Sequence, residues 1–147
     1  MRCLVTGGTG FVGSNLTLAL QEQGHEVIIT GHESEQIMPE FKGKCLYPGF
    51  LGIDWNAIGK VDILFHQAAI NGTRVNDEKE IMRANLESSI QLFNYVIAHG
   101  CRKIVYASST AIYGNNPAPY HESDPPNPQT PYAVLSNSFD GFSGLSL

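Results

Sequence analysis

The sequence lacks the features that mark membrane, secreted and nucleic-acid-binding proteins. Its longest apolar runs are about five residues, against the roughly 20 that a bilayer-spanning helix needs. Met1 to Gly7 leads directly into a strand-like segment, without the apolar stretch of about seven residues found in signal peptides. There is no basic run, and the net charge is −5. We therefore expect no membrane and no nucleic-acid partner, because a polyanion requires a basic face.

Cysteine is also scarce. Cys3, Cys45 and Cys101 are scattered and odd in number, which favours reduced thiols over a disulfide framework and indicates a cytoplasmic protein. No spacing typical of a metal site and no internal repeat is present. The remaining composition, 42% hydrophobic and 16% charged over 147 residues, is typical of a globular domain with one core.

The first 30 residues have the pattern of a strand, a glycine-rich turn, a helix and a second strand. Strands are predicted at Arg2 to Thr6 and Glu26 to Thr30. Between them, Phe11 to Gln23 has helical spacing and Gly24 ends it. The apolar face of this helix is predicted to hold Val12, Leu16, Ala19 and Leu20. Such a βαβ unit requires a parallel pair of strands.

Strands and helices continue to alternate along the chain. Further strands are predicted at Leu46 to Phe50, Asp62 to His66 and Lys103 to Ala107, and helices at Glu78 to His99 and Pro131 to Phe142. The first of these helices carries a predicted apolar stripe and stops at Gly100. That stripe is Leu86, Ile90, Phe93 and Ile97. Ser108 to Gln129 is predicted to be a long loop, which in a compact domain is usually functional. The pattern predicts a doubly wound parallel α/β sheet, with ligands bound beyond the carboxyl ends of its strands.

Glycines occupy positions 7, 10 and 13, directly after the first strand. Gly7 permits the tight turn out of the strand, Gly10 lets a pyrophosphate approach the backbone, and Gly13 lets the helix lie close to the sheet. The N-terminal amides of the helix then face the phosphates. The alternative is a turn that is merely tight, but the strand before it and the helix after it favour a dinucleotide site.

The Gly-x-x-Gly-x-x-Gly spacing and four later segments resemble the extended short-chain dehydrogenase/reductases, and more closely the NAD-dependent nucleotide-sugar epimerases and dehydratases. The segments are His66-Gln67-Ala68-Ala69, Asn85, Ser108-Ser109-Thr110-Ala111-Ile112-Tyr113-Gly114 and Pro131-Tyr132-Ala133. The resemblance extends to about Asp140. It implies that residues 1–147 are an incomplete Rossmann-like NAD(P)-binding domain, truncated after about the fifth strand, with the C-terminal substrate domain absent. It also implies a nucleotide-sugar substrate for the full-length family and a possible homodimer.

The resemblance further implies a set of cofactor contacts, and the nature of the ribose contact bears on the choice of cofactor. In the family an acidic residue often ends the second strand and binds the adenosine ribose, but that position is Gly31 here. Glu33 or His32 could substitute from the loop, although Glu33 is equally well read as a solvated charge. No Arg or Lys lies between Gly24 and Phe41 to hold a 2′-phosphate, so we expect NAD rather than NADP. The implied cofactor-binding residues are Gly7, Thr9, Gly10, Phe11, Val12, Gly13, Gly31, His32, Ala68, Ala69, Asn85, Ala107, Ser108 and Tyr132.

Two polar residues in the middle of the chain have two interpretations each. His66 could be a catalytic base, but its place at a strand end favours a packing or hydrogen-bonding role. Asn85 lies within the long predicted helix, and by resemblance it orders the catalytic loop and a water molecule. A plain exposed asparagine is the alternative.

Catalysis in the resembled family uses a Tyr-x-x-x-Lys pair and a Ser or Thr that holds the same substrate oxygen. Ser109 matches the latter and Tyr132 matches the tyrosine, but the lysine position is Ser136, and no lysine follows Lys103. Without the ammonium group, a phenol of pKa ~10 is only about one part in a thousand ionised at neutral pH. Packing is the alternative role for Tyr132.

The resemblance thus implies an enzyme that oxidises a sugar carbon with NAD, then epimerises or dehydrates the sugar and returns the hydride. Ser136 and the short chain raise two alternatives: a non-catalytic, redox-sensing dinucleotide-binding module, or an inert fragment. We expect residues 1–147 alone to have no epimerase or dehydratase activity.

Overall fold

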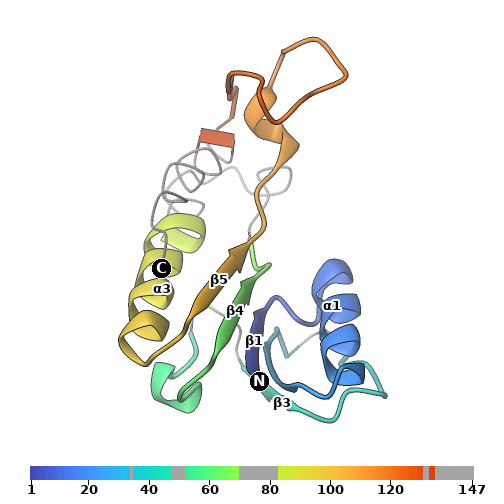
Figure 1. Cartoon of the computed structure of the whole chain (residues 1–147), viewed down its shortest axis with the longest axis vertical. Helices are drawn as coiled ribbons and strands as arrows, with labels where there is room; N and C mark the ends of the chain where they lie inside the picture. The colour runs from blue at the N-terminus through green and yellow to red at the C-terminus, as the bar shows by residue number, and fades with distance from the viewer. Residues whose placement is uncertain (34, 48–51, 70–82, 131–132, 135–147) are drawn as a thin grey trace. The chain divides into compact units, whose positions relative to one another are not determined.

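The computed structural model describes residues 1–33, 35–47, 52–69, 83–130 and 133–134 (Figure 1). The chain divides into two compact units. Unit 1 comprises Met1–Ala69 and Ser88–Tyr106, and unit 2 comprises Ile70–Glu87 and Ala107–Leu147.

Unit 1 is built on a five-stranded sheet with the order β3-β2-β1-β4-β5, in which every neighbouring pair is parallel. The chain therefore adds strands on one side of β1 and then crosses to the other side, which creates a switch point beside β1. This confirms the predicted Rossmann-like parallel sheet. The strands are β1 (Arg2–Thr6), β2 (Glu26–Thr30), β3 (Lys44–Leu46), β4 (Ile63–His66) and β5 (Lys103–Tyr106).

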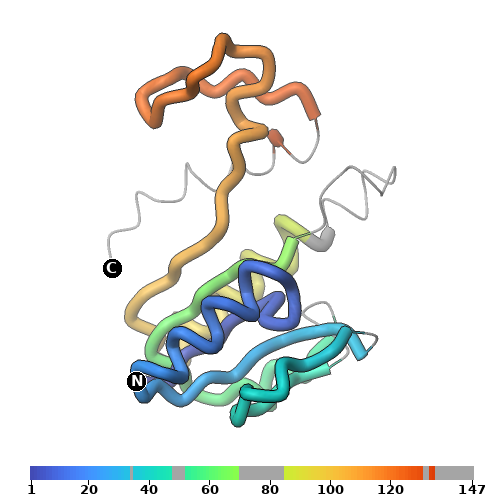
Figure 2. Tube along the Cα trace, turned by 90° about the vertical axis from the view of Figure 1, so that its right-hand side faces the viewer, coloured from blue at the N-terminus to red at the C-terminus, as the bar shows by residue number. Residues whose placement is uncertain are grey.

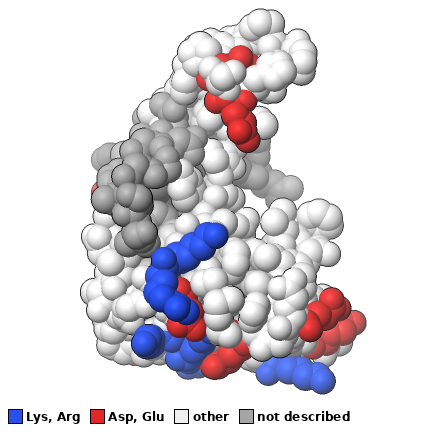
Figure 3. Space-filling view, in the orientation of Figure 1, with Lys and Arg blue, Asp and Glu red and all other residues white. Residues whose placement is uncertain are grey.

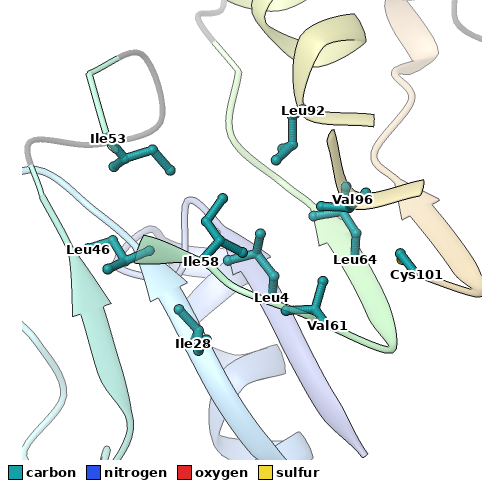
Figure 4. Close-up of a cluster of buried hydrophobic side chains, with 10 residues drawn as sticks. All are labelled: Leu4, Ile28, Leu46, Ile53, Ile58, Val61, Leu64, Leu92, Val96 and Cys101. Atoms are coloured by element: carbon teal, nitrogen blue, oxygen red, sulfur yellow. The ribbon is translucent and has the colours of Figure 1, made fainter. Parts of the chain in front are cut away.

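Alternate residues of the strands pack on opposite faces of the sheet. Leu4 and Leu64 belong to a cluster that includes Leu92 and Val96 of α3 (Ser88–Ala98), as Figure 4 shows. Val5 belongs to a second cluster that is completed by α1 (Phe11–Glu22). Figure 1 accordingly shows α1 and α3 on opposite sides of the strands. The period-2 alternation of a strand thus gives the sheet two apolar faces, each covered by a helix.

Helix α1 ends where the sequence predicts, but it buries a different face. Gly24 has a φ of 79°, and the next N–H, of His25, bonds to the Leu20 carbonyl (3.1 Å). Val12 is exposed, and so is Ala19, so their predicted packing is wrong. The buried residues of α1 are Gly13, Thr17 and Leu20. Small residues on this face let the helix lie close to the sheet.

The stripe predicted for the long helix is also wrong by one position. Ile97 is 40% exposed, and Leu86, Ile90 and Phe93 are only partly buried. The buried residues of α3 are instead Ser89, Leu92 and Val96. The predicted stop is confirmed, because Gly100 has a φ of 86° and the Cys101 N–H bonds to the Val96 carbonyl (2.9 Å). Residues 78–82 of the predicted helix lie outside the described residues.

Three predicted strands have slightly different bounds in the structure. The third strand ends at Leu46, where it was predicted to begin, and residues 48–50 lie outside the described residues. Asp62 precedes β4 and Ala107 follows β5. Asp62 instead fastens the start of the sheet, because its carboxylate accepts the Arg2 N–H (2.8 Å) and pairs with Arg102 (3.5 Å).

In unit 2, the predicted loop from Ser108 to Gln129 contains a short 3₁₀ helix, Thr110–Tyr113. Beyond it the chain turns back on itself, as Figure 2 shows in orange. The Asn127 N–H bonds to the Ile112 carbonyl (2.7 Å), and the Asn116 side chain donates to the Pro125 carbonyl (2.8 Å). Of the helix predicted from Pro131 to Phe142, only Ala133 and Val134 are described, and both are helical.

The surface of unit 1 carries mixed charge. On the face in Figure 3, basic side chains lie among acidic ones, and Arg2 pairs with Glu26 (2.9 Å). All three cysteines are free thiols in the structure. Within the described part of the chain, no helix is both long and apolar enough to cross a membrane. Nor does that part contain three or more His, Cys, Asp or Glu side chains grouped to hold a metal ion.

Candidate functional site

The glycine-rich turn lies at the carboxyl end of β1 and is fastened to the neighbouring strand β2. Gly7 has a φ of 67°, a backbone conformation that residues other than glycine rarely adopt. Its N–H donates to the Thr30 hydroxyl (3.2 Å), and the Gly8 N–H donates to the Thr30 carbonyl (2.9 Å). The Gly10 N–H closes the turn on the Gly7 carbonyl (3.0 Å). The turn therefore has a fixed shape.

Three glycines of the turn have different surroundings. A Cβ on Gly13 would lie 2.1 Å from the Gly7 oxygen, so the absent side chain lets the helix pack directly on the turn. A Cβ on Gly8, which the sequence analysis did not single out, would lie 2.5 Å from Cβ of Ile29. A Cβ on Gly10 would meet only the Gly7 oxygen, at 3.3 Å. Gly10 therefore leaves open space in front of the turn.

The start of α1 is open to a ligand. Gly10 is the N-cap residue, and no side chain caps the helix. Phe11 and Val12, the first two helical residues, are 88% and 60% exposed. The backbone N–H groups of a first helical turn carry partial positive charge and bind anions such as phosphate. The uncapped turn and the space at Gly10 together fit a pyrophosphate.

At the end of β2, the loop supplies a carboxylate that contacts the turn. The Thr9 hydroxyl and the His32 N–H both donate to Oε2 of Glu35, the latter at 3.1 Å. The hydrogen bond from Thr9 is the main cause that holds the pKa of Glu35 below its usual value. A Cβ on Gly31 would lie 2.4 Å from Cγ2 of Thr9. The sequence analysis named Glu33 or His32 as the substitute for the acidic residue that the resembled family often has at the position of Gly31. In the structure, the residue of this loop that is hydrogen-bonded to the turn is Glu35.

The end of β4 lies against the same turn. The N–H groups of Gln67 and Ala68 both donate to the Thr6 hydroxyl oxygen (3.2 Å each). A Cβ on Gly7 would lie 3.1 Å from both Cα and N of Ala68. Ala69, the next residue, is exposed. Unit 1 therefore brings together the predicted residues of the turn, Gly31 and His32 after β2, and Ala68 after β4.

His66 is buried and joins β1 to α3. Its Nδ1 lies 2.7 Å from the Thr6 hydroxyl, and its Nε2 lies 2.7 Å from the Ser89 hydroxyl. Because the Thr6 oxygen accepts two N–H groups, its own hydrogen points to Nδ1, which leaves the hydrogen of the imidazole on Nε2, directed at Ser89. Burial lowers the pKa of His66 to about 4, so the ring is neutral. The predicted hydrogen-bonding role is confirmed.

We expect this histidine to make the protein sensitive to acid. The unfolded chain binds a proton at His66 near pH 6.5, whereas the folded chain does so only near pH 4. The unfolded state therefore binds more protons between these values, and the free energy of unfolding falls as the pH drops through this window. In urea titrations, His66 should make the free energy of unfolding about 2 to 3 kcal/mol lower at pH 4.5 than at pH 7.5.

The variant His66→Gln keeps hydrogen-bonding groups but does not titrate, so its stability should depend less on pH over the same range. The exposed His121 provides the matched control, and His121→Gln should keep the dependence of the parent protein. An unchanged pH dependence in His66→Gln would contradict this assignment.

Asn85 belongs to unit 2 and is buried, with 6% of its surface exposed. The interpretation as a plain exposed asparagine is therefore wrong. It lies in a short π-helix, Arg83–Glu87, directly before α3. Such π-helical turns are rare and are frequent at functional sites.

The other predicted residues of unit 2 follow β5. Ala107 and Ser108 are exposed. Ser109 is partly buried, and its hydroxyl accepts the Ala111 N–H (3.2 Å), which caps the 3₁₀ helix. Tyr132 and Ser136, the predicted catalytic tyrosine and the substituted lysine position, lie outside the described residues.

Comparison with known proteins identifies the family. Residues 3–140 match the model of the NAD dependent epimerase/dehydratase family. The chain belongs to this family. The glycine turn, the ends of β2 and β4, and the serines after β5 all lie within the matched residues.

Two curated members of the family show how much of an enzyme the chain covers. It is 31% identical to a UDP-N-acetyl-alpha-D-glucosaminuronate decarboxylase of Bacillus cytotoxicus, over 84% of this chain and 41% of the relative. It is also 31% identical to a UDP-glucose 4-epimerase of Halalkalibacterium halodurans, over 90% of this chain and 42% of the relative. The chain thus spans less than half the length of these relatives.

A solved structure of similar fold is that of the protein MoeE5 in complex with UDP-glucose and NAD. It matches 97% of this chain and 48% of its own with a TM-score of 0.84, at 26% identity. This match supports the Rossmann-like architecture that the sheet order shows.

Proposed function

We propose that the chain is the dinucleotide-binding part of an NAD-dependent nucleotide-sugar epimerase or dehydratase. The observation that carries this proposal is the open glycine turn at the start of an uncapped helix, in a chain of this family. NAD held there would supply a hydride acceptor for a sugar carbon. The protein supplies the position of the cofactor and the proton transfers.

The residues proposed to hold the cofactor lie at the ends of successive strands. The turn and the start of α1 would bind the pyrophosphate through backbone N–H groups. Residues after β2 would bind the adenosine ribose, and the small residues Ala68 and Ala69 would let the cofactor cross the end of β4. Asn85, Ala107, Ser108 and Tyr132 would complete the contacts from unit 2.

The first test is calorimetric titration of the folded chain with NAD and with NADP. We expect NAD to bind more tightly, because the loop after β2 offers carboxylates and no cation to a 2′-phosphate. Tighter binding of NADP would overturn the argument about the ribose. A folded sample that binds neither would overturn the proposed cofactor for this chain.

The substrate class is proposed from the relatives, whose names describe enzymes of UDP-sugars. Ser109 would hold the reacting sugar oxygen and Tyr132 would exchange its proton. We place this reaction in the cytoplasm, with a homodimer as the proposed assembly. Residues 1–147 correspond to the N-terminal dinucleotide-binding domain of such an enzyme in this proposal.

A specific observation favours a second candidate, a dinucleotide-binding module without catalysis. Ser136 stands where the resembled family has lysine, and a hydroxyl carries no charge to stabilise a phenolate at Tyr132. Binding of NAD without any turnover, even after a substrate domain is joined to the chain, would support this candidate over the first.

A further inference from the structure

The loop after β2 places one carboxylate oxygen against the glycine turn and leaves the other available. Oε2 of Glu35 accepts the hydrogen bonds from the Thr9 hydroxyl and the His32 N–H. No other described residue is hydrogen-bonded to this carboxylate, and the side chain is exposed. An ionised carboxylate has about four acceptor positions, so Oε1 remains able to accept hydroxyl groups from a ligand.

Thr9 and Gly31 explain why the carboxylate comes from the loop rather than from the strand end. The Thr9 side chain occupies the space that a Cβ at position 31 would need, with Cγ2 and Oγ1 at 2.4 Å and 2.6 Å from that point. An acidic residue at position 31 would therefore displace Thr9. With glycine there, Thr9 remains in place and binds a carboxylate from four residues further along the chain.

We infer that Glu35 binds the 2′-hydroxyl of the adenosine ribose of NAD and repels the 2′-phosphate of NADP, with Thr9 and His32 as the residues that position it. This inference rests on the proposed NAD-binding function. In dinucleotide-binding folds an acidic side chain near the end of the second strand accepts a hydrogen bond from this hydroxyl. A hydrogen bond to an ionised acceptor is strong, whereas two anions at the same place repel each other.

Glu33 is the matched alternative in the same loop. It is exposed, as Glu35 is, but among the described residues it has no hydrogen-bond partner. A free carboxylate contributes to the net charge near the site without a fixed direction. Comparing variants of the two residues therefore distinguishes the effect of a positioned hydrogen-bond acceptor from that of general charge repulsion.

The experiment is calorimetric titration of the chain with NAD, with NADP and with the 2′-deoxyadenosine analogue of NAD. In Glu35→Gln we expect the Kd for NAD to rise about tenfold, because a charge-assisted hydrogen bond is lost. The Kd for NADP should stay the same or fall, so the preference for NAD decreases. Glu33→Gln should leave the Kd for NAD within about twofold of the parent protein.

The deoxy analogue tests the contact itself. It lacks the hydroxyl group, so Glu35→Gln should bind it as the parent protein does. Thr9→Val keeps the shape of the side chain but loses the donor to the carboxylate, and we expect a smaller loss of NAD affinity, about threefold. Circular dichroism checks that each variant is folded. Because Glu35 is exposed, we expect its replacement to leave the fold intact.

The outcomes separate this inference from the function on which it rests. If the parent protein binds NAD and Glu35→Gln binds it equally well, or loses as much affinity for the deoxy analogue as for NAD, the role of Glu35 is wrong and the proposed function stands. If the folded parent protein binds neither NAD nor NADP, both are wrong.

Discussion

NAD binding should be lost in Gly10→Val, while the fold is retained. The Cβ at this position would meet only one atom within 4 Å, the Gly7 oxygen at 3.3 Å, so the turn has room for the side chain. That same room is where the pyrophosphate would lie against the N-terminal amides of α1. A branched side chain there excludes the phosphates, and we expect at least a hundredfold increase in Kd, on the order of 3 kcal/mol or more. Calorimetry measures the affinity, and circular dichroism measures the fold.

Gly13→Ala is the matched comparison. It should destabilise the fold, whereas Gly10→Val should leave the fold intact. Its Cβ would lie 2.1 Å from the Gly7 oxygen and 2.9 Å from Cα of Gly8, both backbone atoms that cannot rotate away. We expect the free energy of unfolding to fall by about 3 kcal/mol or more, since the turn or the helix must shift. If Gly10→Val binds NAD normally, or if Gly13→Ala is as stable as the parent protein, the assignment of roles within the turn is wrong.

The second large effect concerns catalysis. We expect a polypeptide of residues 1–147 to turn over no common nucleotide sugar at a measurable rate. Ser136 carries no charge and cannot stabilise a phenolate at Tyr132 as the lysine of the resembled family would. Each unit by which such a lysine lowers a phenol pKa raises the ionised fraction about tenfold. The polypeptide also has little remote contact with which to orient a sugar nucleotide. Ser136→Lys alone should therefore give no activity.

Four proteins test this expectation against a panel of nucleotide sugars: residues 1–147 with Ser136 or with Ser136→Lys, each alone and each joined to the C-terminal part of a relative. The joined Ser136→Lys protein should be active, and at least about a hundredfold more so than the joined protein that keeps Ser136, if the ammonium shifts the phenol by two pKa units. Tyr132→Phe in the active protein should remove that activity. Turnover at an ordinary enzymatic rate by the unmodified polypeptide would show that another group acts as the base.

The sheet and the turn could be predicted because their signals are local. Three glycines between a strand and an amphipathic helix, and short β-branched segments between helices, specify the parallel architecture without knowledge of distant contacts. Gly24 and Gly100 likewise predict the ends of their helices correctly, because a positive φ at such a stop favours glycine.

The buried stripe of α3 could not be predicted from hydrophobicity, because it contains a polar residue. Ser89 is fully buried, and its partner His66 lies in a strand more than twenty residues earlier. A pattern of apolar residues therefore selects the neighbouring stripe, which contains Ile90 and Ile97. Burial of a hydroxyl costs free energy unless it is hydrogen-bonded, and that bond is visible only in three dimensions.

The ribose position illustrates the same limit at the candidate site. The sequence shows that Gly31 cannot supply a carboxylate, and it offers Glu33 or His32 as the substitute. Which residue of the loop reaches the turn depends on where the loop folds, and the bond between Thr9 and Glu35 is set by the turn after β1 rather than by the loop itself. Spacing along the chain does not report such a contact.

The position of β1 at the centre of the sheet affects the order in which unit 1 can be assembled. One edge of β1 pairs with β2, which follows closely in the sequence, with Arg2 opposite Glu26. The other edge pairs with β4, which comes much later in the sequence, with Cys3 opposite Ile63. As the chain leaves the ribosome, β1 and β2 can pair around α1 well before β4 has been made. During that interval the second edge of β1 has unpaired N–H and C=O groups, which makes it a site for wrong strand pairing until β4 closes it.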